Sequence, residues 1–248
     1  MITLKTPEEI EIIAEGGKIL AKTLKELERI AKPGITTSEL DRAAEALILS
    51  SGGKPAFKGY SGFPYALCAS VNENIVHGFP SDYKLKDGDI LKLDLGVLYK
   101  GFNTDSAITV AIGDVSFETK RLLNVTKKSL RLGIKKAKIG NTIGDIGNTI
   151  QRFVEDQGFG VVRDLCGHGI GKSVHEDPKI PNFGKRQSGE KLLEGMVICI
   201  EPMVTMGDYN IKSSKDGYGY ATKDGSLSAH FEHTIAITQN GPRVLTEL

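Results

Sequence analysis

Two aspartates, Asp94 and Asp105, stand in apolar runs on either side of a predicted turn. The run DILKLDLGVLY precedes Lys100-Gly101, and the run NTDSAITVAI follows it. Apolar runs of this kind around a short glycine turn are typical of a β-hairpin. The hairpin therefore brings both carboxylates into one small region of a sheet.

The register of this hairpin decides how close the two aspartates come. A turn at Lys100-Gly101 places Asp94 opposite Ala107, with Asp105 diagonally across on the same face. A shift of the turn would place the two aspartates directly opposite each other. In both registers their Cβ atoms lie about 5 to 8 Å apart. Two like charges at that separation require a cation.

Two glutamates and a histidine extend this set. Glu201 lies within MVICIEPMV, and Glu232 lies within AHFEHTIAIT. A buried, unpaired carboxylate costs several kcal/mol or becomes protonated, and metal binding removes that cost. Four carboxylates neutralise two divalent ions, and His168 in CGHGIG adds a nitrogen ligand. Paired ions that activate a water are a known hydrolytic arrangement.

The carboxylates occupy matched places in an internal repeat. KPGITTSELDRAAEALILSSGG near residue 32 resembles KIGNTIGDIGNTIQRFVEDQGF near residue 138, with a glycine, a cap threonine and an acid in register. Asp94 then corresponds to Glu201, and Asp105 corresponds to Glu232. We expect residues 1–248 to form one α+β domain with an internal duplication, about 1–113 and 114–248, whose two sheets meet around a central site.

Helix signals precede the strands that must hold these residues. Thr6 with Glu9, and Thr36 with Glu39, each form the pattern of a capping box at a helix start. The first helix is expected to end at Lys32-Pro33-Gly34. Strands should follow the second helix, beginning with YALCASVN.

Composition excludes several classes of partner. The 248 residues are 40% hydrophobic and 25% charged, with 32 basic against 31 acidic side chains, so nothing indicates nucleic-acid or membrane binding. The stretch KKSLRLGIKKAK is interpreted as the solvated face of a helix. Cys68, Cys166 and Cys199 are odd in number and scattered, which favours a reducing compartment. Because the start resembles no signal peptide, we expect a cytoplasmic protein.

The ligands and the segments around them resemble a known family. Asp94, Asp105, His168, Glu201 and Glu232 occur in order with VNENIVHGFP, CGHGIG, VHEDP, IEPM and KDGSLSAHFEHTIAIT. This set closely resembles bacterial type I methionine aminopeptidases over nearly the whole chain. The resemblance implies the pseudo-twofold pita-bread fold, with two antiparallel sheets flanked by helices. It also implies removal of the N-terminal methionine from nascent proteins whose second residue is small.

The resemblance assigns the metal ligands. Asp94, Asp105 and Glu232 hold one ion, and Asp105, His168, Glu201 and Glu232 hold the other. Cobalt, manganese, iron and zinc all suit such ligands, so the sequence does not select among them. The implied partner is the N-terminus of a nascent polypeptide, met at the ribosome, and a monomer is expected.

Catalytic and substrate-binding roles also follow from the resemblance. His77 and His175 would contact the substrate and stabilise the tetrahedral intermediate, while Glu201 would carry the proton of the nucleophilic water. His230 and His233 flank Glu232 and are expected on the opposite face from it, as structural residues.

An apolar pocket for methionine completes the implied site. Its lining residues would be Tyr60, Phe63, Cys68 and Tyr218. Phe63 stands where the family often has tyrosine, and Tyr218 stands where tryptophan is usual. Tyr60 and Phe63 also suit an ordinary aromatic core, and a nucleophilic role for Cys68 is disfavoured because ALCASVN reads as a packed strand.

Three other functions compete with this interpretation. Pita-bread peptidases that act on Xaa-Pro bonds usually carry a separate N-terminal domain, for which the chain is expected to lack room. Type II methionine enzymes usually carry a long insertion between the last two glutamates, here only 31 positions apart (232 minus 201). Non-catalytic relatives that bind protein or RNA typically lose ligands, and here none is lost.

Overall fold

The structure is a computed structural model that describes residues 2–214 and 216–248. Its helices are α1 (Pro7–Ile30), α2 (Thr37–Ser50), α3 (Phe117–Lys136) and α4 (Ile143–Asp156). Thr6 and Thr36 form the two expected capping boxes, and Thr142 forms a third at the start of α4. Within the described residues, no helix is long and apolar enough to cross a membrane.

Strands follow each pair of helices. Those before α3 are β1 (Lys54–Pro55), β2 (Cys68–Val71), β3 (Asn74–Val76), β4 (Ile90–Tyr99) and β5 (Phe102–Ala111). Those after α4 are β6 (Gly160–Val161), β7 (Cys166–Gly169), β8 (Glu176–Pro181), β9 (Val197–Ile200), β10 (Met203–Thr205), β11 (Ile211–Ser213), β12 (Tyr220–Thr222), β13 (Ser228–His230), β14 (His233–Thr238) and β15 (Gly241–Val244). The order helix, helix, strands thus occurs twice.

All strand pairs in the described residues are antiparallel. One four-stranded sheet contains β1, β2, β4 and β5, and a five-stranded sheet has the order β15-β14-β9-β7-β8. Two three-stranded sheets, β13-β10-β6 and β11-β12-β3, complete the set. The β4–β5 hairpin turns at Lys100-Gly101, with Asp94 opposite Ala107 and Asp105 opposite Gly96. The two aspartates are therefore diagonal neighbours, as in the first of the two predicted registers.

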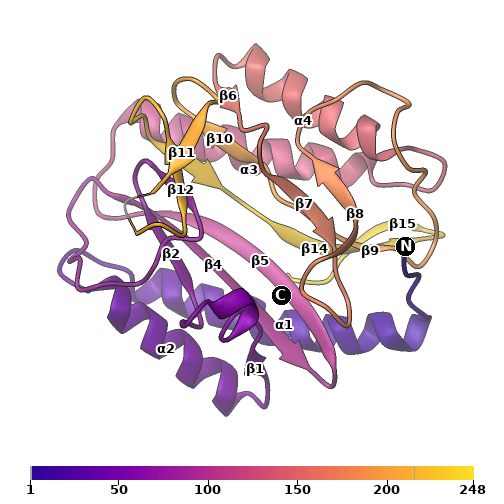
Figure 1. Cartoon of the computed structure of the whole chain (residues 1–248), viewed down its shortest axis with the longest axis horizontal. Helices are drawn as coiled ribbons and strands as arrows, with labels where there is room; N and C mark the ends of the chain where they lie inside the picture. Colours follow the sequence, from indigo (N-terminus) through magenta and orange to yellow (C-terminus); the bar gives the residue numbers. More distant parts are fainter. Residues whose placement is uncertain (1, 215) are drawn as a thin grey trace.

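The α1–α2 pair covers the four-stranded sheet and the α3–α4 pair covers the five-stranded sheet, and the first half of α1 also packs against β9 and β14. Leu91, Leu93 and Leu95 of β4 pack in one core with leucines of α1 and α2, which leaves Asp94 on the other face of the strand. Isoleucines of α3 and α4 pack in another core with those of β9 and β14. Figure 1 shows the α1–α2 pair and the α3–α4 pair on opposite sides of the strands. Burial of each such side chain stabilises the fold by about 1.5 to 3 kcal/mol.

Two threonine hydroxyls join β5 to strands of two other sheets, β14 of the five-stranded sheet and β13 of a three-stranded sheet. The hydroxyl of Thr234 on β14 donates to the backbone carbonyl of Asp105 at 2.7 Å and accepts from the Asp105 N–H at 2.9 Å. The hydroxyl of Thr109 on β5 makes the same two bonds, at 2.7 and 2.9 Å, with the carbonyl and N–H of His230. These four bonds satisfy buried backbone groups where the sheets meet. They fix β5 against the segment that carries Glu232.

Candidate metal centre

All of the residues predicted for the site line one cavity of about 230 Å³. They are Tyr60, Phe63, Cys68, His77, Asp94, Asp105, His168, His175, Glu201, Tyr218 and Glu232. Phe57 and Ser61 also line it and were not predicted. The cavity lies where segments from both ends of the chain meet.

Both large sheets supply carboxylates to this cavity. Asp94 and Asp105 come from β4 and β5, and Glu201 follows the last residue of β9. Glu232 lies between β13 and β14, and its N–H donates to the carbonyl of Ala107 at 2.9 Å. Because Ala107 is the residue opposite Asp94, this bond holds Glu232 beside the hairpin aspartates.

The carboxylates are buried and crowd one another. Burial raises the pKa of Asp105, Glu201 and Glu232 well above the ordinary values, and the neighbouring negative charges raise them further. Burial also raises the pKa of Asp94. The protein alone therefore leaves this cluster short of positive charge.

His168 presents one defined nitrogen to the cluster. Its Nδ1 lies 2.9 Å from the carbonyl of Gly169, which can only accept a hydrogen bond, so Nδ1 carries the proton. Its Nε2 lies 3.9 Å from Asp105 Oδ2 and 3.7 Å from Glu201 Oε1. Burial lowers the pKa of His168 to about 3, so the ring is neutral. An unprotonated Nε2 aimed at carboxylates is in the tautomer that metal binding requires.

Several oxygens in this cluster have no partner from the protein. Among the described residues, Asp94 Oδ1, Asp105 Oδ1 and Glu232 Oε1 are buried without a hydrogen bond. Buried polar atoms are normally satisfied, so these three call for a ligand that accepts their lone pairs. A divalent metal ion fits them, since it prefers carboxylate oxygen and imidazole nitrogen.

Cys199 lies beside the same cluster and was missed as a site residue. Ligand atoms of Asp105, His168, Cys199 and Glu232 all lie within 4.8 Å of one another. Burial and the nearby carboxylates raise the pKa of the Cys199 thiol well above its ordinary value, so the sulfur is protonated. The only sequence signal for it was its place two residues before Glu201 on the same strand face.

The two other predicted histidines stand at the edge of the cluster. His175 directly precedes β8, and its ring centroid lies 4.3 Å from that of His168. His77 follows β3 in a left-handed conformation, with φ of 60°, which is uncommon outside glycine and is found at functional sites. Tyr60 Oη lies 2.8 Å from His175 Nδ1, although the two residues are 115 positions apart in the chain.

Aromatic side chains form the apolar part of the cavity. Phe63 is buried, and its ring centroid lies 5.4 Å from that of Tyr218 and 5.5 Å from that of Phe79. Cys68 is buried in the same cluster, and burial raises the pKa of its thiol well above the ordinary value. A protonated thiol is a poor nucleophile.

One expectation about the histidines around Glu232 was wrong. His230 was expected to face away from Glu232, but the two are separated by one residue, and such positions share a strand face. His230 Nε2 lies 3.6 Å from Glu201 Oε2, and the side chain is 1% exposed. His233 does point elsewhere, since its Nδ1 lies 2.9 Å from Thr246 Oγ1.

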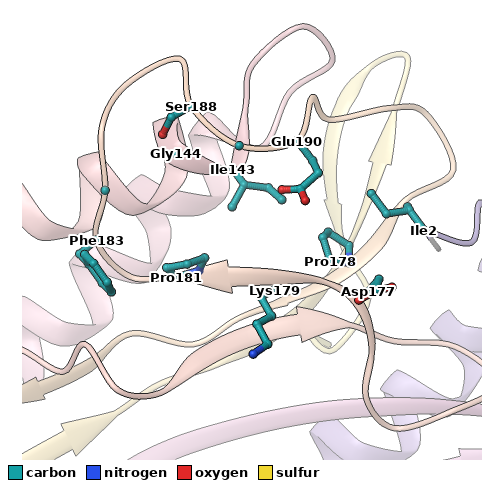
Figure 2. A pocket seen from close by; sticks show the side chains of 12 residues that line it. Ile2, Ile143, Gly144, Asp177, Pro178, Lys179, Pro181, Phe183, Ser188 and Glu190 are labelled. Atoms are coloured by element: carbon teal, nitrogen blue, oxygen red, sulfur yellow. The ribbon is translucent and has the colours of Figure 1, made fainter.

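A larger cavity, of about 680 Å³, lies away from this cluster (Figure 2). It is lined by β8, the start of α4 and the loop around Ser188, and none of the predicted site residues reaches it. The lining mixes apolar side chains such as Ile143 and Pro181 with isolated charges. Size alone therefore does not identify the reactive site of this molecule.

The arrangement of buried carboxylates and one imidazole between paired helices and antiparallel sheets is that of a pita-bread metallopeptidase. The model of Metallopeptidase family M24 matches residues 11–239. The chain belongs to this family, and within it to the methionine aminopeptidases of the bacterial type.

Two close relatives and one distant one support this assignment. Methionine aminopeptidase of Clostridium perfringens is 52% identical over 246 residues, which cover 99% of each chain. The crystal structure of methionine aminopeptidase from Thermotoga maritima matches with a TM-score of 0.98 and 44% identity over the whole of both chains. Prolidase from Pyrococcus furiosus matches with a TM-score of 0.80 and 26% identity, and this chain covers 65% of it.

Proposed function

We propose that this metallopeptidase removes the N-terminal methionine from nascent proteins whose second residue is small, using a water activated by two metal ions. The observation that carries the proposal is the convergence of Asp94, Asp105, His168, Glu201 and Glu232, three of which have a buried oxygen without a protein partner. The full-length similarity to methionine aminopeptidases supports the choice of substrate.

Five residues of the cluster would hold a pair of divalent ions. Asp94, Asp105 and Glu232 suit one ion, and Asp105, His168, Glu201 and Glu232 suit the other. Cobalt, manganese, iron and zinc are the candidates. When bound, such a pair polarises the scissile carbonyl and lowers the pKa of the nucleophilic water.

The protein's own side chains then handle protons and charge. Glu201 would take the proton from the attacking water and pass it to the leaving amine. His77 and His175, at the edge of the cluster, would donate hydrogen bonds to the substrate carbonyl as negative charge develops on it. Tyr60, Phe63, Cys68 and Tyr218 would enclose the methionine side chain, since aromatic faces and a neutral thiol offer it an apolar, polarisable surface.

The setting of the reaction is part of the proposal. We place the enzyme in the cytoplasm, where N-termini of nascent chains emerge from the ribosome, and we expect a monomer that does not itself bind nucleic acid or membrane. We also propose that residues 1–248 form a single catalytic domain built by duplication, with halves of about 1–113 and 114–248. The two capping boxes at Thr36 and Thr142 support this, since each opens the second helix of a half.

A peptide-release assay tests the function directly. Purified protein loaded with each candidate metal should release methionine from Met-Ala and Met-Gly peptides and should not act on peptides with a bulky second residue. Faster cleavage of Xaa-Pro dipeptides would assign the chain to the prolidase-like branch of the fold instead. Absence of hydrolysis with every metal, in folded protein that binds metal, would indicate a non-catalytic binding module.

A further inference from the structure

A tyrosine and a histidine far apart in the chain are joined at the mouth of the cavity. Tyr60 Oη lies 2.8 Å from His175 Nδ1, although 115 positions separate the two residues. Their ring centroids lie 5.2 Å apart, with an angle of 52° between the planes. The contact is a hydrogen bond between the Tyr60 hydroxyl and the Nδ1 nitrogen of the His175 ring.

The backbone around Tyr60 holds its phenol in place. The Tyr60 N–H donates to the carbonyl of Phe57 at 2.9 Å, and the Phe63 N–H donates to the carbonyl of Tyr60 at 2.9 Å. Gly59 and Ser61, on either side, adopt left-handed conformations with φ of 88° and 47°. A left-handed serine carries strain that tends to persist at functional sites. The turn therefore fixes the direction of the Tyr60 side chain.

Hydrogen-bond chemistry favours one direction for the proton between the two rings. A phenol hydroxyl is a good donor, and an unprotonated imidazole nitrogen is a better acceptor than a phenol oxygen. If Tyr60 donates to Nδ1, a neutral His175 carries its single proton on Nε2. The opposite tautomer would leave Nε2 without a proton and unable to donate. Only the first tautomer gives the substrate a hydrogen-bond donor.

We propose that Tyr60 is a positioning residue for His175, whose hydroxyl donates to Nδ1 and so keeps the ring proton on Nε2 for donation to the substrate carbonyl oxygen. This inference rests on the proposed function, because it assumes that His175 acts on a substrate carbonyl. It gives Tyr60 a role beyond lining the methionine pocket.

The two roles of Tyr60 are physically coupled. The Tyr60 ring lines the same cavity as Phe63, and the two residues are joined by a backbone hydrogen bond. A substrate side chain that packs on the Tyr60 ring therefore acts on the same group that orients His175. A side chain that fills the pocket correctly should then raise kcat as well as lower KM.

Nuclear magnetic resonance tests the tautomer without any hydrolysis. Protein labelled with ¹⁵N in histidine and loaded with zinc, which is diamagnetic, gives two-bond proton–nitrogen correlations that distinguish the two tautomers. The His175 signals are those missing from the spectrum of His175→Gln. We expect protonation on Nε2 in the wild-type protein and a mixture of tautomers in Tyr60→Phe. Protonation of His175 on Nδ1 in the wild-type protein would overturn the proposal.

Kinetics of the metal-loaded enzyme test the consequence for turnover. Tyr60→Phe keeps the ring that lines the pocket, so KM should change little. It removes the hydroxyl that orients His175, so kcat should fall about 10-fold, as for loss of other orienting partners. The matched control is Tyr65→Phe, because Tyr65 packs in the same aromatic group on Phe63 and Phe79 but does not line the cavity. It should leave kcat unchanged.

A double-mutant cycle separates positioning from general loss of structure. In a His175→Gln background, Tyr60→Phe should have no further effect on kcat, because the group it orients is gone. Equal effects of Tyr60→Phe in both backgrounds would contradict the proposal. A wild-type protein that hydrolyses no methionyl peptide would contradict the proposed function, while the spectrum would still decide the tautomer.

Discussion

The side chain of Thr234 forms hydrogen bonds with both backbone groups of Asp105, 129 positions earlier in the chain. The backbone of Asp105 on β5 is thus held against β14 of the five-stranded sheet by a single hydroxyl group. Thr234→Val removes that hydroxyl with little change in shape and leaves the buried N–H and carbonyl of Asp105 unpaired. Affinity for divalent metal should fall about 10- to 100-fold, as for loss of other groups that orient a ligand. Titration calorimetry of metal into metal-free protein measures this.

Thr238→Val is the control for that experiment. Thr238 lies on the same strand, and its hydroxyl donates to Gly241 in the β14–β15 turn, away from the metal cluster. It should bind metal as the wild-type protein does. Equal metal affinity of Thr234→Val and the wild-type protein would show that the hydrogen bonds of Thr234 do not position Asp105.

Asp105→Ala and His175→Ala should separate metal binding from turnover. Asp105 contributes to both proposed ions, so its removal should abolish activity together with bound metal. His175 stands outside the cluster, so His175→Ala should retain metal and lower kcat about 100-fold, the scale of losing one hydrogen-bond donor to a developing charge. Metal content by elemental analysis beside methionine release provides both readouts. Equal metal loss in the two variants would contradict the roles assigned.

Asp41 predicts a dependence of stability on pH. Its carboxylate accepts hydrogen bonds from the N–H groups of Ala66 and Leu67, but burial outweighs them and raises its pKa. A raised folded pKa stabilises the protein below the unfolded pKa of about 3.9, and that contribution is lost as pH rises through the folded pKa. Asp41→Asn keeps an acceptor oxygen without the charge. As the pH rises from about 4.5 to about 7, the unfolding free energy of Asp41→Asn should therefore increase relative to that of the wild-type protein.

Urea unfolding of both metal-free proteins at the two pH values measures this difference, and absence of metal removes the contribution of metal binding. A difference in unfolding free energy that stays constant with pH would show that Asp41 does not titrate differently in the folded state.

Gly17 should not tolerate a side chain. A Cβ atom at this position of α1 would lie 2.0 Å from the carbonyl oxygen of Leu245, near the C-terminus. Gly17→Ala must therefore push the helix away from this segment, at a cost of about 1 to 3 kcal/mol, typical of an overfilled core. Denaturant unfolding gives the value. Lys18→Ala, one residue on and exposed, should change stability by less than about 0.5 kcal/mol.

Local patterns in the sequence were enough to predict the starts of α1 and α2 and the β4–β5 hairpin. The capping threonines act on N–H groups three residues away, and the Lys100-Gly101 turn fixes which residues face each other, so both effects are written in adjacent residues. The convergence of Asp94 with Glu201 followed from the internal repeat. Their placement in one cavity agrees with that expectation, although their roles as ligands remain a prediction.

The contacts that orient these residues could not be predicted in the same way. Two such contacts join segments more than a hundred positions apart: Thr234 with Asp105, and Tyr60 with His175. The residues next to a threonine or tyrosine in the sequence do not indicate which distant residue its hydroxyl will contact. Cys199 was missed because it follows no metal-binding spacing. The misplacement of His230 was an error of strand alternation, which the spacing from Glu232 was sufficient to avoid.

The hydrogen bonds that join β5 to β13 and β14 have a consequence for how the enzyme matures. Thr234 and Thr109 hold the backbones of Asp105 and His230 beside the carboxylates, so an ion that binds there would join segments more than a hundred positions apart in the chain. The proposed ligands run from Asp94 to Glu232, a span of 138 positions (232 minus 94). A ribosome must therefore synthesise every segment of this span before the molecule can acquire its proposed ions. An enzyme proposed to trim chains early in their synthesis can itself become active only after this long span of its own chain has been made.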